Sequence, residues 1–355
     1  MKIINTLSVL FFLLVAVACS SESDTIMNDI DREVESSTER VAIFNVSFMS
    51  DATQTKSSGA EDVEGGIEAI GSEASISNCF IAVLNEKDEV VASSFYYGDS
   101  FTQSDNTTTI KDRMIVKVSA DELPALRFLA VTNLYSFLDG YQGTSKNLLL
   151  SCKKLQEIKD IVLVDEAPTV LVKVGISKEY SNYKTDSSNN EETQNSTSVS
   201  IPVYQRSAAI ELADFKVVDS NNRKIEAKVT SLKLLNVKES AKIEGEADCN
   251  VHSSNPYTIT DNKYNTTHIY AYDNTSDAKT SLEITYEVNG VPYSRTYTIK
   301  TPTGIKDNYT ETVEGGKLYQ LYVTVSASSS DISFVVKDWT LKNIDLGTIE
   351  GTEKK

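Results

Sequence analysis

Histidine is the side chain most often used for proton transfer and metal binding near neutral pH, and this sequence of 355 residues holds only two, His252 and His268. Neither lies in an HExxH motif or beside another ligand-type residue at metal spacing. The sequence also contains no GxSxG nucleophile elbow, no P-loop and no GxGxxG motif. We therefore expect no enzyme activity, no metal site and no cofactor.

Carboxylates are abundant, with 51 Asp and Glu against 34 Lys and Arg and a net charge of −17. Pairs of carboxylates are expected at that density, so their presence does not indicate a glycosidase. The segment Asp219-Ser-Asn-Asn-Arg223 resembles a calcium loop only in part, because Arg223 takes a ligand position and the Gly and distal Glu are missing. We predict a hairpin turn there. The acidic surface also excludes nucleic acid as a partner.

Cys19 is the next candidate for chemistry, because it follows a leader-like segment. Lys2 is basic, and Leu7–Val17 is an apolar run, broken only by Ser8, that is too short to span a bilayer comfortably. Small residues, Ala16-Val17-Ala18, stand directly before the cysteine. The pattern resembles the bacterial lipobox, although Ala16 stands where Leu is more usual, and it implies an acylated Cys19. An ordinary secretory signal with an incidental cysteine is the alternative.

The residues after Cys19, Ser-Ser-Glu-Ser-Asp, resemble the short acidic export tag of Bacteroidales surface lipoproteins. This resemblance implies a lipid anchor in the cell outer membrane with the protein facing outwards. Three further cysteines, Cys79, Cys152 and Cys249, are far apart and odd in number, so at most one disulfide could form. We expect buried free thiols.

Short alternating segments with turn signals between them predict an all-β fold made of β-sandwiches. The predicted strands are 80–84, 115–118, 128–134, 170–176, 199–204, 208–212, 229–237, 268–272, 282–288, 293–299, 318–325 and 332–339. Two short helices are expected, one capped by Ser119 and one over 151–161. The polar stretch 181–198 separates two apolar strands and is predicted to be a long hairpin loop.

Residues 41–49 predict one further strand, with Ala42, Phe44, Val46 and Phe48 on one face. Polar stretches flank it, and the second contains Lys56-Ser57, a bond suited to a trypsin-like protease. Loss of the strand would leave an apolar groove, and refilling it with large apolar side chains is worth about 5–12 kcal/mol before entropy. A strand from another copy could do this by donor-strand complementation. Alternatively, 41–49 is the permanent first strand of a stable sandwich.

The order of several weak motifs resembles the fimbrillin family of Bacteroidales type V pili. The segments are Thr55-Lys56-Ser57, Phe80-Ile-Ala-Val-Leu-Asn, Glu89-Val-Val-Ala-Ser, Phe128-Leu-Ala-Val-Thr-Asn-Leu, Gln205-Arg206-Ser-Ala-Ala-Ile-Glu-Leu, Leu232-Lys-Leu-Leu-Asn-Val, Ile269-Tyr-Ala-Tyr-Asp-Asn-Thr, Tyr319-Gln-Leu-Tyr-Val-Thr-Val and Val336-Lys-Asp-Trp339. The resemblance covers nearly the whole chain. It implies two transthyretin-like β-sandwich domains, proteolytic loss of the first strand and polymerisation by strand exchange.

Two departures from the family pattern bear on the mechanism. Family members are cut after Arg, whereas Lys56 follows the predicted strand here and Arg40 precedes it. The chain also ends in a polar tail, so the candidate donor strand is 339–346, with apolar anchors Trp339, Leu341, Ile344 and Leu346. Its alternation is imperfect, because Leu341 and Ile344 are an odd number of residues apart.

We therefore predict a structural subunit of a surface fimbria that supports adhesion. The expected parts are a signal peptide (1–19), an acidic tether with a removable first strand (20–56), an N-terminal β-sandwich (57–204) and a C-terminal β-sandwich with the donor strand (205–355). The expected partners are other fimbrial subunits, the outer membrane through its lipid, and a trypsin-like protease. A monomeric surface lipoprotein that binds glycan or protein is the main alternative.

Overall fold

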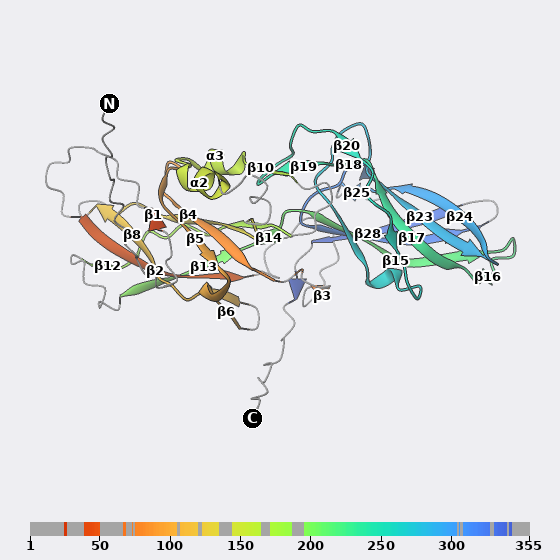
Figure 1. The fold of residues 1–355 in the computed structure, drawn as a ribbon, viewed down its shortest axis with the longest axis horizontal. Helices are drawn as coiled ribbons and strands as arrows, with labels where there is room; N and C mark the ends of the chain where they lie inside the picture. Colours follow the sequence, from red (N-terminus) through yellow and green to blue (C-terminus); the bar gives the residue numbers. More distant parts are fainter. Residues whose placement is uncertain are drawn as a thin grey trace, which may run out of the picture.

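Two β-sandwiches lie end to end along the long axis of the molecule (Figure 1). The computed structural model describes residues 25–26, 39–49, 67–68, 73, 75–104, 107–119, 123–134, 144–164, 171–186, 195–303, 305, 308–326, 330–338 and 341–342. Every segment predicted as a strand, from 41–49 to 332–339, overlaps an observed strand. The predicted all-β class is confirmed.

The first sandwich packs two six-stranded sheets face to face. One sheet has the order β1-β5-β4-β9-β11-β14. In the other sheet, β2 is central. One edge of β2 pairs with β12 and β13, its other edge pairs with β7 and β8, and β6 pairs with β7. The strands are β1 (Thr25–Ile26), β2 (Glu39–Met49), β4 (Asn78–Leu84), β5 (Val90–Tyr97), β6 (Phe101–Ser104), β7 (Thr107–Ile110), β8 (Met114–Ser119), β9 (Arg127–Thr132), β11 (Lys173–Ile176), β12 (Thr185–Asp186), β13 (Ser196–Pro202) and β14 (Tyr204–Gln205). A short 3-10 helix, Gly98–Ser100, joins β5 to β6.

The second sandwich also has two sheets. One has the order β16-β15-β27-β28, with β22 beside β15, and the other has the order β21-β17-β23-β24. The strands are β15 (Ala208–Val218), β16 (Lys224–Ile225), β17 (Lys228–Leu235), β21 (Tyr257–Thr258), β22 (His268–Ala271), β23 (Ser281–Val288), β24 (Val291–Thr298), β27 (Lys317–Val325) and β28 (Ser330–Asp338), with a 3-10 helix at Tyr264–Thr266. Asn289 and Gly290, with φ of 51° and 76°, form the two-residue turn between β23 and β24.

The two sandwiches repeat one strand plan. In each, one early strand runs parallel to a late strand, β2 with β13 and β15 with β27, and carries two antiparallel partners on its other edge. The facing sheets match as β5-β4-β9-β11 and β21-β17-β23-β24. The two plans differ in one respect in the described residues. The second edge of β27 pairs with β28, whereas β13 pairs only with β2. β2 therefore holds in the first sandwich the central place that β15 holds in the second.

A shared core joins the sandwiches. Helices α2 (Thr144–Ser151) and α3 (Leu155–Lys159) lead to β10 (Val162–Val164), which pairs antiparallel with β19 (Ser240–Lys242) of the second sandwich. One apolar cluster contains Leu155, Ile158 and Leu163 together with Ala241, Ile243 and Tyr272. The remaining small pairs are β18 (Val237–Lys238) with β20 (Val251–His252), β25 (Thr301–Pro302) with β26 (Tyr309–Thr310), and β3 (Ile67–Glu68) with β29 (Leu341–Lys342).

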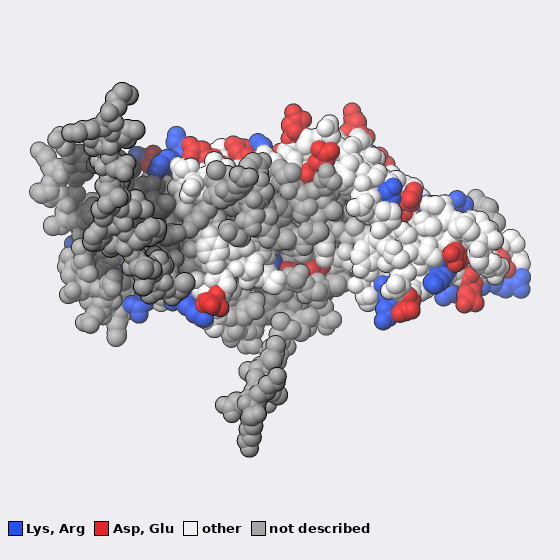
Figure 2. Space-filling model, in the orientation of Figure 1, with Lys and Arg blue, Asp and Glu red and all other residues white. Residues whose placement is uncertain are grey.

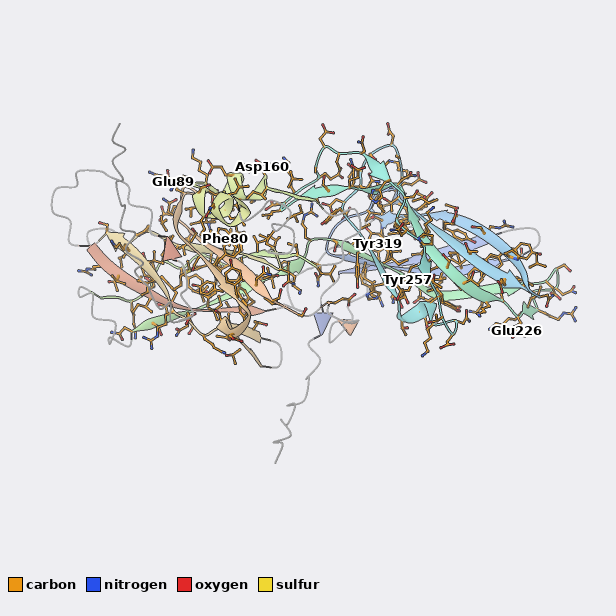
Figure 3. The ribbon with its side chains drawn as sticks, in the orientation of Figure 1. Phe80, Glu89, Asp160, Glu226, Tyr257 and Tyr319 are labelled. Carbon is orange, nitrogen blue, oxygen red and sulfur yellow. The ribbon has the colours of Figure 1, made fainter. Side chains whose placement is uncertain are left out.

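Side-chain placement follows the alternation of the strands. Tyr319 points into the second sandwich and Phe80 lies in the cluster beneath α2 and α3; both are fully buried, whereas Glu226 and Tyr257 lie at the surface (Figure 3). Acidic and basic side chains are interspersed on the face shown in Figure 2, with acidic ones gathered along its upper edge. In the part of the chain that the structure describes, no helix is long and apolar enough to cross a membrane.

Two local predictions were wrong, and one predicted helix is shorter than expected. The stretch 181–198 is no hairpin loop, because β11 pairs in one sheet with β9 and β14 while β13 pairs in the other sheet with β2. The helix expected over 151–161 is present as α3, but it spans only Leu155–Lys159, with Leu155 and Ile158 buried. Ser119, expected to cap a helix, is the last residue of β8. Residues 120–122 lie outside the described residues, and residues 123–125 are not helical.

The turn predicted at 219–223 is confirmed. β15 and β16 pair antiparallel on either side of it, and the Asp219 carboxylate accepts hydrogen bonds from the backbone N–H groups of Asn221 and Arg223. Asn222 adopts a φ of 60°, which asparagine tolerates better than most residues. The carboxylate that suggested a calcium ligand thus serves the turn itself. The three described cysteines, Cys79, Cys152 and Cys249, are free thiols; the first two are buried and the third is half-buried.

A buried lysine lies where the sandwiches meet. Lys173 is 5% exposed, and its ammonium group donates a hydrogen bond of 3.0 Å to the carbonyl oxygen of Ser75. Burial lowers the pKa of Lys173 to about 8, against the opposing attraction of the Glu73 carboxylate. The folded protein therefore releases this proton at lower pH than the unfolded chain does.

This buried charge gives a pH-dependent stability. Between pH 8 and 10.5 the unfolded chain binds more protons at Lys173 than the folded protein, so stability rises with pH in that window. We predict that the free energy of unfolding increases by about 2 kcal/mol more in wild type than in Lys173→Met between pH 7.5 and 10. Urea unfolding at both pH values measures this difference. Identical pH dependence in both proteins would contradict the assignment.

Candidate functional site

The inward face of β2 is buried in the first sandwich. Ala42, Phe44, Val46 and Phe48 are 0–2% exposed, and all four belong to the cluster that fills this core. The ring of Phe44 meets Phe128 edge-on with centroids 4.9 Å apart and lies 5.5 Å from the ring of Tyr183. Burial of the three larger side chains contributes about 5–9 kcal/mol to the attachment of this strand.

β2 is paired along both of its edges. On one edge, Ile43 to Met49 run parallel to Ser196–Pro202 of β13. On the other edge, the first half of β2 pairs with β8 and the last three residues pair with β7. Two side chains reinforce the β13 edge: the Asn45 amide donates to Ser196 Oγ (2.7 Å), and the Ser47 hydroxyl donates to the carbonyl of Val199 (3.2 Å). Removing β2 would therefore open a slot between two sheet edges, with an apolar floor.

The segment that leads into β12 closes one side of this slot. Tyr183 packs on Phe44 and donates its hydroxyl hydrogen to the carbonyl of Pro124 (2.9 Å), and burial raises the pKa of Tyr183 to about 12. The hydroxyl of Tyr180 accepts a hydrogen bond from the backbone N–H of Ser200 in β13. The Tyr180–Ser200 hydrogen bond therefore ties β13 to this segment independently of its pairing with β2.

The predicted site residues are only partly described. Cys19, Lys56, Ser57, Trp339, Ile344 and Leu346 lie outside the described residues. Of the predicted donor segment, the backbone of Leu341 and Lys342 is described as β29, which runs parallel to β3. Arg40, expected to precede the strand, lies inside β2 and pairs with Val118 of β8. The bond after Arg40 is thus within a paired strand, which protects it from a protease.

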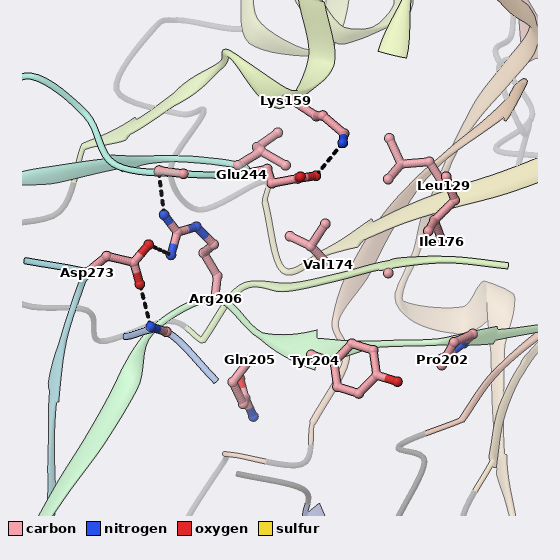
Figure 4. A pocket seen from close by; sticks show the side chains of 14 residues that line it. Leu129, Lys159, Val174, Ile176, Pro202, Tyr204, Gln205, Arg206, Glu244 and Asp273 are labelled. Atoms are coloured by element: carbon pink, nitrogen blue, oxygen red, sulfur yellow. Dashed lines mark hydrogen bonds and ion pairs between the residues drawn. The ribbon is translucent and has the colours of Figure 1, made fainter. Parts of the chain in front are cut away.

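A cavity of about 490 Å³ lies at the junction of the sandwiches (Figure 4). Its wall is apolar at Leu129, Val174 and Ile176, and two ion pairs lie at its sides: Arg206–Asp273 at 2.8 Å and Lys159–Glu244 at 2.7 Å.

The Arg206 guanidinium also donates to the carbonyl oxygens of Lys242 (2.7 Å) and Gly245 (2.5 Å). Arg206 thereby ties the chain just before β15 to the end of β19 and to the turn that follows it, which is a structural role. Among the described residues, no group of three or more His, Cys, Asp and Glu side chains is placed to hold a metal ion.

Comparison with known proteins shows the fold. No family model and no curated protein matches the chain. A candidate cell adhesion protein from Parabacteroides distasonis superposes with a TM-score of 0.55 at 14% identity, covering 85% of this chain and 98% of that one. A fimbrial assembly protein from the same organism has a TM-score of 0.50 at 16% identity, covering 84% and 96%. A further candidate adhesion protein from it has a TM-score of 0.51 at 11% identity, covering 85% and 99%.

The chain shares their fold. At these identities the likeness concerns architecture, and it extends over both sandwiches because more than four fifths of the chain is covered. Sequence reasoning found β2 and its inward face but missed its neighbours; the alternation of Val199, Ile201 and Val203 marked β13 as a strand without showing that it pairs with β2.

The packing of Phe44 predicts a large loss of stability on truncation. Phe44→Ala should lower the free energy of unfolding of the lipid-free precursor (residues 20–355) by about 3–5 kcal/mol, because it leaves a cavity beside Phe128 and Tyr183. The matched control, Asn45→Ala on the outward face, should cost about 1 kcal/mol. Urea unfolding measures both values, and similar losses for the two variants would count against a core role of β2.

Proposed function

We propose that this chain is a structural subunit of a surface fimbria, in which removal of β2 lets a strand of another copy take its place. The precursor is anchored in the outer membrane through a lipid on Cys19 and faces outwards. A trypsin-like protease cuts between Lys56 and Ser57 and separates residues 20–56 from the body. The mature subunits then assemble into the fimbrium and support adhesion.

The place of β2 carries this proposal. It is an interior strand whose inward-facing residues are buried in the core. It nevertheless belongs to a segment that a cut at the Lys56–Ser57 bond would separate from the rest of the chain. An empty slot with two unpaired edges is costly, because backbone groups lose their partners and apolar side chains meet water. A replacement strand with alternating apolar residues restores both kinds of contact.

The donor in this proposal is the segment 339–346, with Trp339, Leu341, Ile344 and Leu346 as its apolar anchors. It follows β28, at the end of the chain that belongs to the second sandwich. A contact between the C-terminal end of one copy and the first sandwich of the next is head-to-tail, so it propagates as a filament. The fold shared with a fimbrial assembly protein and with candidate adhesion proteins supports this assignment.

Limited digestion tests the mechanism. Low-dose trypsin on the lipid-free precursor should produce a new N-terminus at Ser57 and SDS-resistant ladders, because the emptied slot captures a strand from a neighbour. The variant Lys56→Gln should keep its N-terminal segment and remain monomeric under the same dose. N-terminal sequencing and unboiled gels supply the two readouts. A clean cut at Ser57 that yields a single monomeric band would favour the alternative of a monomeric binding module.

The anchor is tested separately in whole cells. Cys19→Ala should abolish incorporation of labelled palmitate and shift the protein out of the outer-membrane fraction, because no other thiol near the leader can take the lipid. Cys79→Ala is the matched control and should label like wild type, since that thiol is buried in β4. Equal labelling of wild type and Cys19→Ala would reject the lipoprotein assignment.

A further inference from the structure

The cavity between the sandwiches exposes part of an apolar sheet face. Leu129 of β9 pairs with Ile176 of β11, and Val174 of β11 pairs with Tyr204 of β14, so these side chains share one face of the first sheet. Helices α2 and α3 cover another part of this face. Beyond α3, Ile176 and Tyr204 line the cavity and are each 36% exposed. A concave apolar floor of this kind is common in small-molecule sites.

A charged pair lies across this floor from Tyr204. The Lys159 ammonium group of α3 is 2.7 Å from the Glu244 carboxylate, and the two side chains are 25% and 59% exposed. In the view of Figure 4, Val174 lies between this pair and the ring of Tyr204. An ammonium group has three donors and a carboxylate has two acceptor oxygens, so the pair can also bind hydroxyl groups of a ligand.

The charges of the cavity favour a ligand without net charge. The four charged side chains among the described residues of its lining form two ion pairs, Lys159–Glu244 and Arg206–Asp273. An ionic ligand would have to break one of these pairs or leave its own charge without a partner. Anionic ligands are disfavoured further by the net charge of −17 on the chain.

The floor offers little backbone to an added strand. β11 pairs with β9 along one edge and with β14 along the other, so its backbone groups are used within the sheet. β14, the edge strand, is only two residues long. A ligand with rigid rings, an apolar C–H face and hydroxyl groups at its rim fits this lining better than a peptide. Its face can lie on Tyr204 while its hydroxyl groups reach Lys159 and Glu244.

We infer that this cavity binds a short neutral saccharide, with Tyr204 as the stacking surface and the Lys159–Glu244 pair as the hydrogen-bonding edge. Its volume of about 490 Å³ lies in the range of small-molecule sites. The inference gives a ligand class to the adhesive role, and in that use it rests on the proposed function. Binding itself belongs to the uncut chain and requires neither cleavage nor strand exchange.

Saturation-transfer NMR on the uncut lipid-free precursor tests the site. The probes are the neutral disaccharides maltose, cellobiose, lactose and mannobiose at millimolar concentration. At least one should receive saturation on its ring C–H protons. Tyr204→Ala should weaken that binding by about tenfold or more, whereas Tyr204→Phe, which keeps the ring, should retain it. Tyr257→Ala removes a 51% exposed tyrosine on β21 and is the matched control, which should bind as wild type does.

Absence of saturation for every probe, or equal binding by wild type and Tyr204→Ala, would overturn the inference. A concentration-dependent dimer of the uncut precursor that Tyr204→Ala abolishes would also overturn it, because the occupant would then be a second copy. Urea unfolding checks that both Tyr204 variants are folded. The ladder assay stays separate: saccharide binding without ladders would reject strand exchange alone, and ladders without saccharide binding would reject this inference alone.

Discussion

The insertion of β2 between β13 and β8 is the interaction on which the first sandwich depends. Its ladder is completed on both edges, and Phe44, Val46 and Phe48 fill the space between the two sheets. The first sandwich therefore needs an extended segment with this alternation at this place. In the proposed assembly, a segment of another copy with the same alternation would meet the same partners.

The repeated strand plan explains why this dependence is confined to one half of the molecule. β15 occupies the equivalent place in the second sandwich, but it follows β14 within three residues and is covered further by β27 and β28. It cannot leave without unfolding its domain. β2 instead comes before a long polar stretch in the sequence, where the proposed cut between Lys56 and Ser57 would separate it from the body.

Local sequence patterns predicted where the strands lie. They did not predict which strands pair, because the partners are far apart in the chain. The alternation of 41–49 identified β2 and its inward residues, because a strand with one buried face leaves a period-two signal. The parallel pairing of Ile43 with Ser196 joins residues far apart in the chain, and no local pattern specifies it. The same reason made 181–198 look like a hairpin loop, since two successive apolar strands were assumed to pair.

The polar junction was invisible from the sequence for a different reason. Glu73 stands in an acidic, glycine-rich stretch and resembles any solvated carboxylate, and His268 was judged only against metal-binding spacings. Their contact, 2.6 Å between Glu73 Oε1 and His268 Nδ1, joins elements of two different sandwiches and has no sequence signature. Likewise, nothing in the sequence distinguishes Lys173 from an exposed lysine, and only the fold places it beside Ser75.

The pairing of β10 with β19, and the apolar cluster around Ile158 and Ile243, have a mechanical consequence. Two domains joined by a bare linker would swing freely, but these two share backbone hydrogen bonds and an apolar cluster, so the angle between them is set by packing. A fibre built from such subunits would bend at the contacts between subunits, and each subunit would stay straight.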